Sequence, residues 1–259
     1  MDLLIITGIA LALMLNFVNG VNDASHSIAT VVETRALSPL KASVSSAIAN
    51  FIGPFMFTTA VAATIGTELV VPGAMTPLSL VVAMLVSIML ILAATHIGLP
   101  VSSSHALIGG ILGTGVAVAG LSALILPPAA TIRALVLFSL TGAGIGALIL
   151  SILAYYLEEG IRPALVLGVI FGISVTIPLM ILAGLLVLSG ILAIVVFIFI
   201  SPVIGFIAAF LFDLLVSHLF RFSRQNRMRR IFQPLQVAAS LFQAAGHGAN
   251  DGQHAVGVI

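Results

Sequence analysis

The sequence has few charged residues and no cysteine, and both absences exclude classes of protein. Without cysteine the chain has no disulfide framework and no thiolate metal site. Charged residues make up 7% of its 259 positions and hydrophobic residues 61%, with a mean hydropathy of +1.30, which excludes an ordinary soluble domain. The net charge of +1 leaves no broad basic surface for nucleic acid. The composition therefore predicts an all-α polytopic membrane protein.

Apolar runs long enough to cross a bilayer recur along the chain. A hydrocarbon core of about 30 Å needs about 20 helical residues. Runs of this kind lie near 3–34, 43–65, 78–98, 101–120, 131–157, 163–188, 189–217 and 235–259. The first run would measure roughly 48 Å as one straight helix, so we expect it to tilt or to break at Gly20. A turn is also needed within 164–217, and Ser189-Gly190 is the best candidate.

Basic residues are concentrated in connections that share one side of the membrane. Seven crossings before the last run place the segments 35–42, 99–100, 158–162 and 218–234 together. These segments hold eight of the nine basic residues: Arg35, Lys41, Arg162, Arg221, Arg224, Arg227, Arg229 and Arg230. An excess of Lys and Arg marks the cytoplasmic side, so we expect a multi-pass protein of the cytoplasmic (inner) membrane with an external N-terminus. A re-entrant hairpin at 99–120 is the alternative, and it would change this count.

One short pattern occurs twice, each time within an apolar run. Residues 20–26 read GVNDASH and residues 248–254 read GANDGQH, at an offset of 228. An ionisable side chain inside a membrane costs at least about 2.5 kcal/mol, so Asp23 and Asp251 are expected to mark an ion or substrate path. The alternative for each copy is a polar kink with a structural role only.

The chemistry of the repeated pattern suits a small cation. Glycine permits local unwinding, which frees backbone carbonyls, and Asn and Asp add hard oxygen ligands. The predicted cation and substrate ligands are Asn22, Asp23, Asn250 and Asp251, with the two aspartates holding sodium if sodium is the coupling ion. A protonated aspartate would serve a proton-coupled protein equally well.

An odd number of crossings separates the two patterns, which makes the repeats antiparallel. Inverted repeats usually frame a central site for alternating access. The expected organisation is a first transport repeat at 1–120, connecting transmembrane helices at 121–217, a basic cytoplasmic loop at 218–234, and the start of the second, inverted repeat at 235–259. The sequence thus predicts an inverted-repeat transporter with broken helices.

A second polar cluster, GLPVSSSH at 98–105, lies between two apolar runs. Pro100 ends one helix and a serine can cap the next. The exposed amides of that helix start, with the hydroxyls of Ser102, Ser103 and Ser104, would form a nest of neutral donors for an anion. Ordinary helix capping is the alternative.

Taken together, these patterns resemble the inorganic phosphate transporter (PiT) family, in its bacterial low-affinity branch. The resemblance rests on GVNDA at 20–24, IATVV at 28–32, TRALSP at 34–39, GLPVSSSH at 98–105 and HGANDGQ at 247–253. It implies a cation-coupled phosphate symporter, not an enzyme, with no cofactor besides the coupling sodium ion or proton. By position, the Asn and Asp residues of both copies would form the cation and phosphate centre, and the three serines would bind the anion.

Three alternatives to phosphate symport stay open, one of which is a structural or receptor-like membrane protein. Sulfate is carried by some relatives in the same family. From another class, an intramembrane hydrolase could use Ser103 with His105 or Asp23, although the duplicated aspartates have no role in that scheme.

Two features depart from the family pattern. Members usually have Asn where this chain has His26, and Asn or Lys where it has His254, so these imidazoles are predicted to sense pH. A second serine cluster would follow the second signature, but the chain ends at Ile259, so we expect a truncated second repeat. The expected partners are phosphate, the coupling cation, membrane lipid, and a second copy of the chain or a completing polypeptide.

Overall fold

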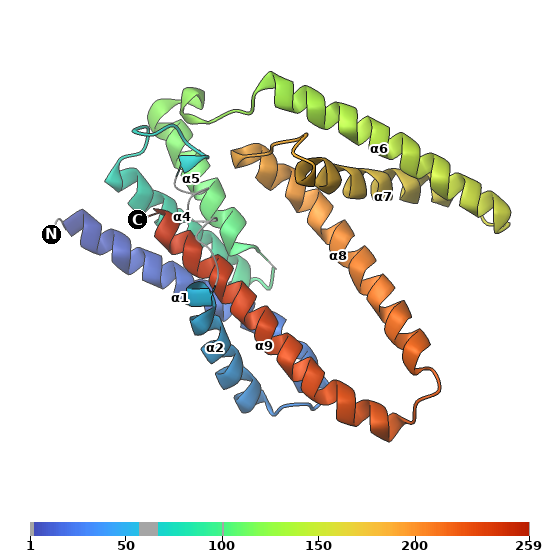
Figure 1. The fold of residues 1–259 in the computed structure, drawn as a ribbon. Helices are drawn as coiled ribbons and strands as arrows, with labels where there is room; N and C mark the ends of the chain where they lie inside the picture. Colours follow the sequence, from blue (N-terminus) through green and yellow to red (C-terminus); the bar gives the residue numbers. More distant parts are fainter. Residues whose placement is uncertain (1–2, 57–66, 100, 259) are drawn as a thin grey trace. The chain divides into compact units, whose positions relative to one another are not determined.

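The computed structural model describes residues 3–56, 67–99 and 101–258, and this part of the chain is almost entirely helical (Figure 1). An isolated bridge joins Val70 and Leu124. The elements are α1 (Leu3–Glu33), α2 (Pro39–Met56), α4 (Pro77–His96), α5 (Ser103–Ala119), the 3-10 turn η1 (Leu121–Ala123), α6 (Ala129–Tyr156), α7 (Ile161–Leu182), α8 (Gly190–Phe220) and α9 (Gln225–Val258).

Among the described helices, five are long and apolar enough to cross a membrane, namely α1, α4, α6, α7 and α8. The predicted all-α membrane class is confirmed. The chain divides into two compact units, Met1–Ile125 with Ser223–Ile259, and Leu126–Phe222. The first unit carries both signature motifs and the serine cluster.

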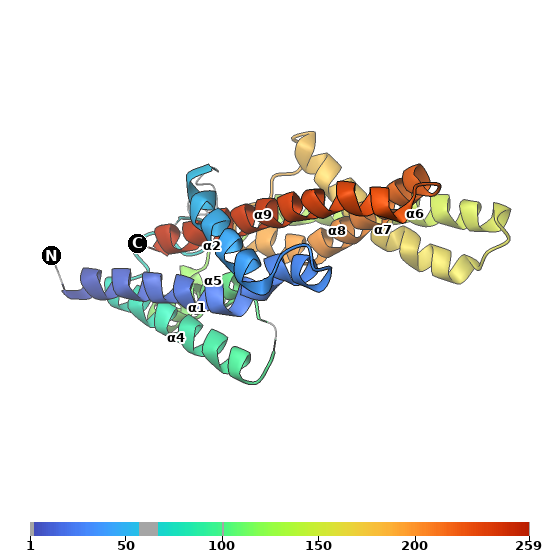
Figure 2. The same ribbon diagram turned by 90° about the horizontal axis from the view of Figure 1, so that it is seen from below.

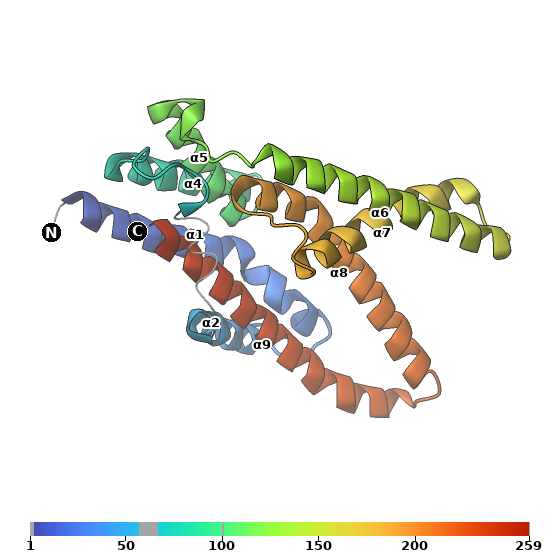
Figure 3. The same cartoon turned by 45° about the horizontal axis from the view of Figure 1, so that its top comes forward.

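Helix α1 is the centre of the first unit. It packs against α2, α4 and α9, while α5 packs against α4 (Figure 2). Side-chain contacts join Thr34 to Gln236, and Asn19 to Asp251. The later residue of α1, Thr34, contacts the earlier residue of α9, Gln236, and the earlier residue of α1 contacts the later residue of α9. The two helices therefore run antiparallel (Figure 3). The inverted orientation predicted for the two signature helices is therefore confirmed by contacts, independently of any count of crossings.

Helices α2 and α9 approach each other as closely as backbones allow. A Cβ at Gly248 would lie 1.9 Å from the carbonyl oxygen of Asn50, and one at Gly53 would lie 2.0 Å from the carbonyl oxygen of Ala245. Only glycine fits at such a crossing, and small residues serve the same purpose in many membrane helix pairs. The crossing places the second signature directly against α2.

The second unit consists of α6, α7 and α8, and its core contains Ile177, Leu186 and Ile200. The turn that precedes α8 ends at Ser189, the N-cap, and Gly190, which has a φ of 54°. Positive φ is a conformation that glycine adopts without strain. The predicted turn at Ser189-Gly190 is confirmed.

Helix α1 runs without interruption through Gly20, so the predicted break there is wrong for this structure. Glycine inside a helix costs about 1 kcal/mol relative to alanine, an amount that tertiary packing readily offsets. Contacts on both sides of Gly20, from Asn19 to α9 and from Asn22 to Thr95 of α4, hold the helix. Its 31 residues exceed a bilayer core, which leaves tilting as the adjustment.

The segment predicted as a basic loop, 218–234, is mostly helical because α8 ends at Phe220 and α9 begins at Gln225. Hydropathy indicates whether a segment prefers the bilayer, but it does not exclude a helix, and arginine is a good helix former. Gln233 Nε2 donates to the carbonyl oxygen of Ala36 over 3.4 Å. Two of the connections predicted to be cytoplasmic therefore lie next to each other.

Helix α5 has 17 residues and begins after the loop that follows Gly98, whose φ is 73°. At 1.5 Å per residue it measures about 26 Å, less than the roughly 30 Å of a hydrocarbon core. The length of α5 is therefore slightly short of a full crossing, whereas the contact between Gln233 and Ala36 agrees with the count that includes a crossing at 99–120.

Candidate functional site

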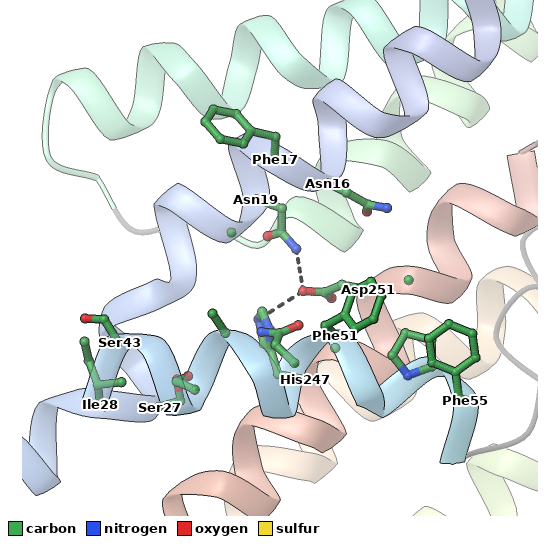
Figure 4. A pocket seen from close by; sticks show the side chains of 17 residues that line it. Asn16, Phe17, Asn19, Ser27, Ile28, Ser43, Phe51, Phe55, His247 and Asp251 are labelled. Carbon is green, nitrogen blue, oxygen red and sulfur yellow. Dashed lines mark hydrogen bonds and ion pairs between the residues drawn. The ribbon is translucent and has the colours of Figure 1, made fainter. Parts of the chain in front are cut away.

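The two signature motifs meet where α1 crosses α9 (Figure 4). Asn19 Nδ2 donates to Asp251 Oδ2, and His247 Nε2 lies 3.3 Å from Asp23 Oδ2. The offset of 228 that relates the motifs also relates Asn19 to His247. Each contact is thus the counterpart of the other with the two helices exchanged. This reciprocity is what two inverted copies of one helix would produce.

The imidazole of His247 joins the two signature carboxylates. Its Nε2 lies 3.0 Å from Asp251 Oδ2 as well as 3.3 Å from Asp23 Oδ2. On the opposite edge of the ring, Asn50 Nδ2 of α2 lies 3.3 Å from Nδ1. When Asn50 donates to Nδ1, Nε2 carries a proton and donates towards the carboxylates. Ligand atoms of Asp23, His247 and Asp251 all lie within 4.8 Å of one another, so the group is compact enough to enclose one cation.

The connection between α4 and α5 is fastened to α1 beside these carboxylates. Asn22 Nδ2 donates to the carbonyl oxygen of Val101 over 3.0 Å, and Thr95 Oγ1 donates to Asn22 Oδ1 over 2.9 Å. Ser103 Oγ donates to Asn19 Oδ1, the same amide that donates to Asp251. A chain of hydrogen bonds therefore leads from the start of α5 to the second signature.

The three predicted anion-binding serines have different positions. Ser102 is the N-cap of α5, and its Oγ accepts from the backbone N–H of His105 over 3.4 Å. Ser103 is buried and reaches Asn19, whereas Ser104 is half-buried in the first helical turn. Capping thus accounts for Ser102, and a hydrogen bond to Asn19 connects Ser103 with Asp251.

The other predicted site residues do not all lie at the carboxylates. Asn250 is adjacent to Asp251 but exposed. The side chain of His26 is exposed too, with Nδ1 3.4 Å from Asp23 Oδ1. His254 continues α9, and its side chain lies outside the described residues.

Four residues join the site that sequence reasoning did not single out. They are Asn19, Asn50, Thr95 and His247. Extending the alignment of the two motifs by one position would have indicated Asn19 and His247 as a matched pair. Asn50 and Thr95 carry no comparable signal, because their role depends on how α2 and α4 pack.

A cavity of about 740 Å³ adjoins the Asp251 carboxylate, between α1, α2 and α9. Asn19, His247 and Asp251 lie at its centre, with Ser27 and Ser43 towards one end and Phe51 and Phe55 towards the other (Figure 4). The cavity therefore connects a carboxylate site with a hydroxyl-lined end and an aromatic end.

Antiparallel signature helices meet at paired carboxylates within a chain of apolar helices, an arrangement typical of inverted-repeat membrane transporters. The pattern of the phosphate transporter family (PHO4) matches residues 19–172, and the chain belongs to this family.

Two bacterial relatives that align with nearly the whole chain carry the same description. The chain is 32% identical over 251 residues to a "Probable low-affinity inorganic phosphate transporter" of Rhizobium meliloti (strain 1021), a match covering 97% of this chain and 57% of the relative. A protein of Bacillus subtilis (strain 168) with the same description is 29% identical over 264 residues, covering 100% of this chain and 60% of the relative. The chain thus spans less than two thirds of the length of these relatives.

A solved structure described as "The sodium-dependent phosphate transporter" has a similar fold. Its TM-score is 0.58 at 20% sequence identity, with 99% of this chain and 66% of that chain covered. The likeness extends to both units of the chain and supports the transporter fold.

Proposed function

We propose that this protein carries out cation-coupled symport of inorganic phosphate across the cytoplasmic membrane. The reciprocal contacts of Asn19 with Asp251 and of Asp23 with His247 carry the proposal, because they unite both carboxylates in one site. The descriptions of the bacterial relatives support phosphate as the substrate. Sulfate has no such support among these descriptions.

Side chains supply the cation ligands in this proposal. Because α1 and α9 are unbroken through the motifs, the motif carbonyls stay within helices, contrary to the unwinding expected from glycine. The carboxylates of Asp23 and Asp251 would hold a sodium ion, which prefers oxygen ligands of this kind. The solved transporter of similar fold is described as sodium-dependent, which supports sodium as the coupling ion.

Neutral donors would bind the anion beside the cation. Ser103 is buried at the first turn of α5, where helical N–H groups and the positive end of the helix dipole favour negative charge. In this proposal the Ser103 hydroxyl turns from Asn19 to the phosphate. A hydrolase would need Ser103 beside a base, but its hydroxyl donates to an amide, which cannot act as one.

Proton coupling is the second candidate, and the position of His247 favours it. An imidazole within 3.3 Å of two carboxylates can carry a proton between them without a metal ion. The two candidates predict different dependences of phosphate binding on sodium and on pH.

Equilibrium binding of radiolabelled phosphate to the purified protein tests the proposal. Sodium coupling predicts that binding strengthens with sodium at constant pH, whereas proton coupling predicts dependence on pH in sodium-free buffer. Excess unlabelled sulfate should displace little of the label. Asp213→Asn, at an exposed carboxylate of α8, is the matched control. Absence of phosphate binding under every condition would reject the proposal, and stronger displacement by sulfate than by phosphate would reject the substrate.

A further inference from the structure

A stripe of polar side chains on α2 leads away from the carboxylate site. Ser43, Ser46 and Asn50 are spaced three and four residues apart, which places them on one face of the helix, and all three line the cavity. The stripe extends about 10 Å at 1.5 Å per residue. Asn50 is the end of the stripe nearest the carboxylates, since its Nδ2 lies 3.3 Å from His247 Nδ1. Ser43 is the other end, near the first turn of α2.

The opposite wall of this part of the cavity is also polar. Ser27 of α1 faces Ser46, with 2.8 Å between the two hydroxyl oxygens, and both residues are buried. Each hydroxyl can satisfy the other while no ligand is present, so this pair avoids the cost of unpaired buried polar groups. Either hydroxyl can also rotate to donate to a passing oxyanion. Neutral donors of this kind bind an anion without trapping it.

Two basic residues precede the stripe in the chain. Arg35, in the connection between α1 and α2, and Lys41, in the first turn of α2, are both exposed. Both belong to the connection that the excess of Lys and Arg predicts to be cytoplasmic. Basic side chains at an entrance raise the local concentration of anions.

We propose that the hydroxyl-lined end of this cavity is the cytoplasmic access route of phosphate, with Ser43, the Ser27–Ser46 pair and Asn50 as successive contacts. This inference rests on the proposed function and assigns a path to it. The cavity volume of about 740 Å³ is many times the roughly 30 Å³ that one water molecule takes up, so the cavity has room for an anion with part of its hydration shell.

Single cysteines can test the route, because the chain has none of its own. Ser43→Cys and Ser46→Cys should react with an anionic, membrane-impermeant thiol reagent in inside-out membrane vesicles from cells that express the protein. Saturating phosphate should slow the reaction at Ser46→Cys by about tenfold, which corresponds to about 1.4 kcal/mol. Ser45→Cys is the matched control, because the Ser45 hydroxyl donates to the carbonyl oxygen of Lys41 over 2.7 Å and the residue is not among those lining the cavity.

A second variant narrows the route without removing a polar group. Ala47 lines the cavity between the stripe residues, so Ala47→Leu should slow phosphate uptake by about tenfold while changing the equilibrium affinity for phosphate by less than about twofold. Val44→Leu, at an exposed position of the same helix outside the lining, should leave both unchanged.

Phosphate binding measured on the same vesicles distinguishes failure of the access route from failure of the proposed function. If wild-type protein binds phosphate but Ser46→Cys is inert or unprotected by phosphate, the route is wrong and the proposed function stands. Unchanged uptake in Ala47→Leu would overturn the route as well. If the wild-type protein binds no phosphate, the proposed function fails and the route fails with it.

Discussion

Two helix crossings in this protein use the same packing device in different surroundings. At the α2–α9 crossing of the first unit, a Cβ on Gly248 would lie 1.9 Å from the carbonyl oxygen of Asn50. At the α6–α7 crossing of the second unit, a Cβ on Gly172 would lie 2.0 Å from the carbonyl oxygen of Gly142. Both crossings therefore require glycine for backbone approach.

The difference lies in the side chains beside the glycines. The α2–α9 crossing is flanked by Asn50, His247 and Asp251, which form the candidate site. The α6–α7 crossing has Thr176 beside Gly142, whereas the described carboxylates and imidazole of the second unit are exposed and lie outside these two helices, namely Glu158, Glu159, Asp213 and His218. Close helix packing thus occurs in both units, and the ionisable groups beside the crossing distinguish the first unit as the one with the candidate site. A matched substitution in the second unit is the control for each substitution in the candidate site.

Neutralising a signature carboxylate should have the largest effect. Asp23→Asn or Asp251→Asn should abolish phosphate uptake in cells expressing the protein, because each removes a charge from the cation site. Membrane insertion should be intact, since an amide is less costly than a carboxylate in the bilayer. Asp213→Asn should keep wild-type uptake. Normal transport by both signature variants, or equal loss of transport in all three variants, would contradict the functional difference between the two units.

Adding one methyl group at each crossing should have the next largest effect. Gly248→Ala and Gly172→Ala both force a Cβ against a backbone carbonyl, at 1.9 Å and 2.0 Å respectively. Overpacking costs typically about 1–3 kcal/mol, so both variants should melt at a lower temperature in detergent. Uptake per folded molecule should fall only in Gly248→Ala, because only that crossing positions His247 and Asp251. Equal loss of specific uptake in both variants would mean that the crossings are functionally alike.

Hydropathy and the repeated motif were enough to predict several features of the structure. They predicted the helical membrane class, the turn before α8, and the pairing of Asp23 with a second signature, and the structure brings both carboxylates together. Composition sets these features, because a long apolar segment has few stable alternatives to a helix in a bilayer.

The missed features depend on contacts between distant segments. Helix α1 stays intact at Gly20 because α4 and α9 hold it, and Asn50 enters the site because Gly53 and Gly248 allow α2 to approach α9. Neither effect follows from the residues next to Gly20 or Asn50 in the chain. The roles of Ser102 and Ser103 could not be separated either, because helix rotation decides which serine faces Asn19.

Removing a buried hydroxyl should have a smaller effect that again separates the units. Ser103→Ala should weaken phosphate binding by about 0.5–3 kcal/mol, the range for hydrogen bonds including those to charged groups. Ser174→Ala, at a buried serine of α7, should leave binding unchanged. Ser102→Ala should lower stability by about 0.5–2 kcal/mol through the lost cap, with little change in binding. Normal phosphate binding by Ser103→Ala would show that the start of α5 is only a helix cap.

The smallest effect is expected from the two histidines that follow the signature aspartates. His26 Nδ1 lies 3.4 Å from Asp23 Oδ1, and His254 occupies the equivalent position after Asp251. Imidazole changes charge between about pH 5 and 8, whereas the amide usual in the family does not. Uptake by the double variant His26→Asn, His254→Asn should therefore depend less on pH than wild-type uptake does, over roughly pH 5.5 to 7.5.

The matched control is His218→Asn, at the exposed histidine of α8 in the second unit. This variant should reproduce the wild-type pH profile, because no signature carboxylate adjoins that position in the chain. All profiles must be corrected for the changing charge of phosphate itself, which alters the substrate over the same range. Because the side chain of His26 is 63% exposed, its charge is screened, so the expected change in the pH profile is small. Superimposable profiles for the double variant and the wild type would show that His26 and His254 do not contribute to the pH dependence of uptake.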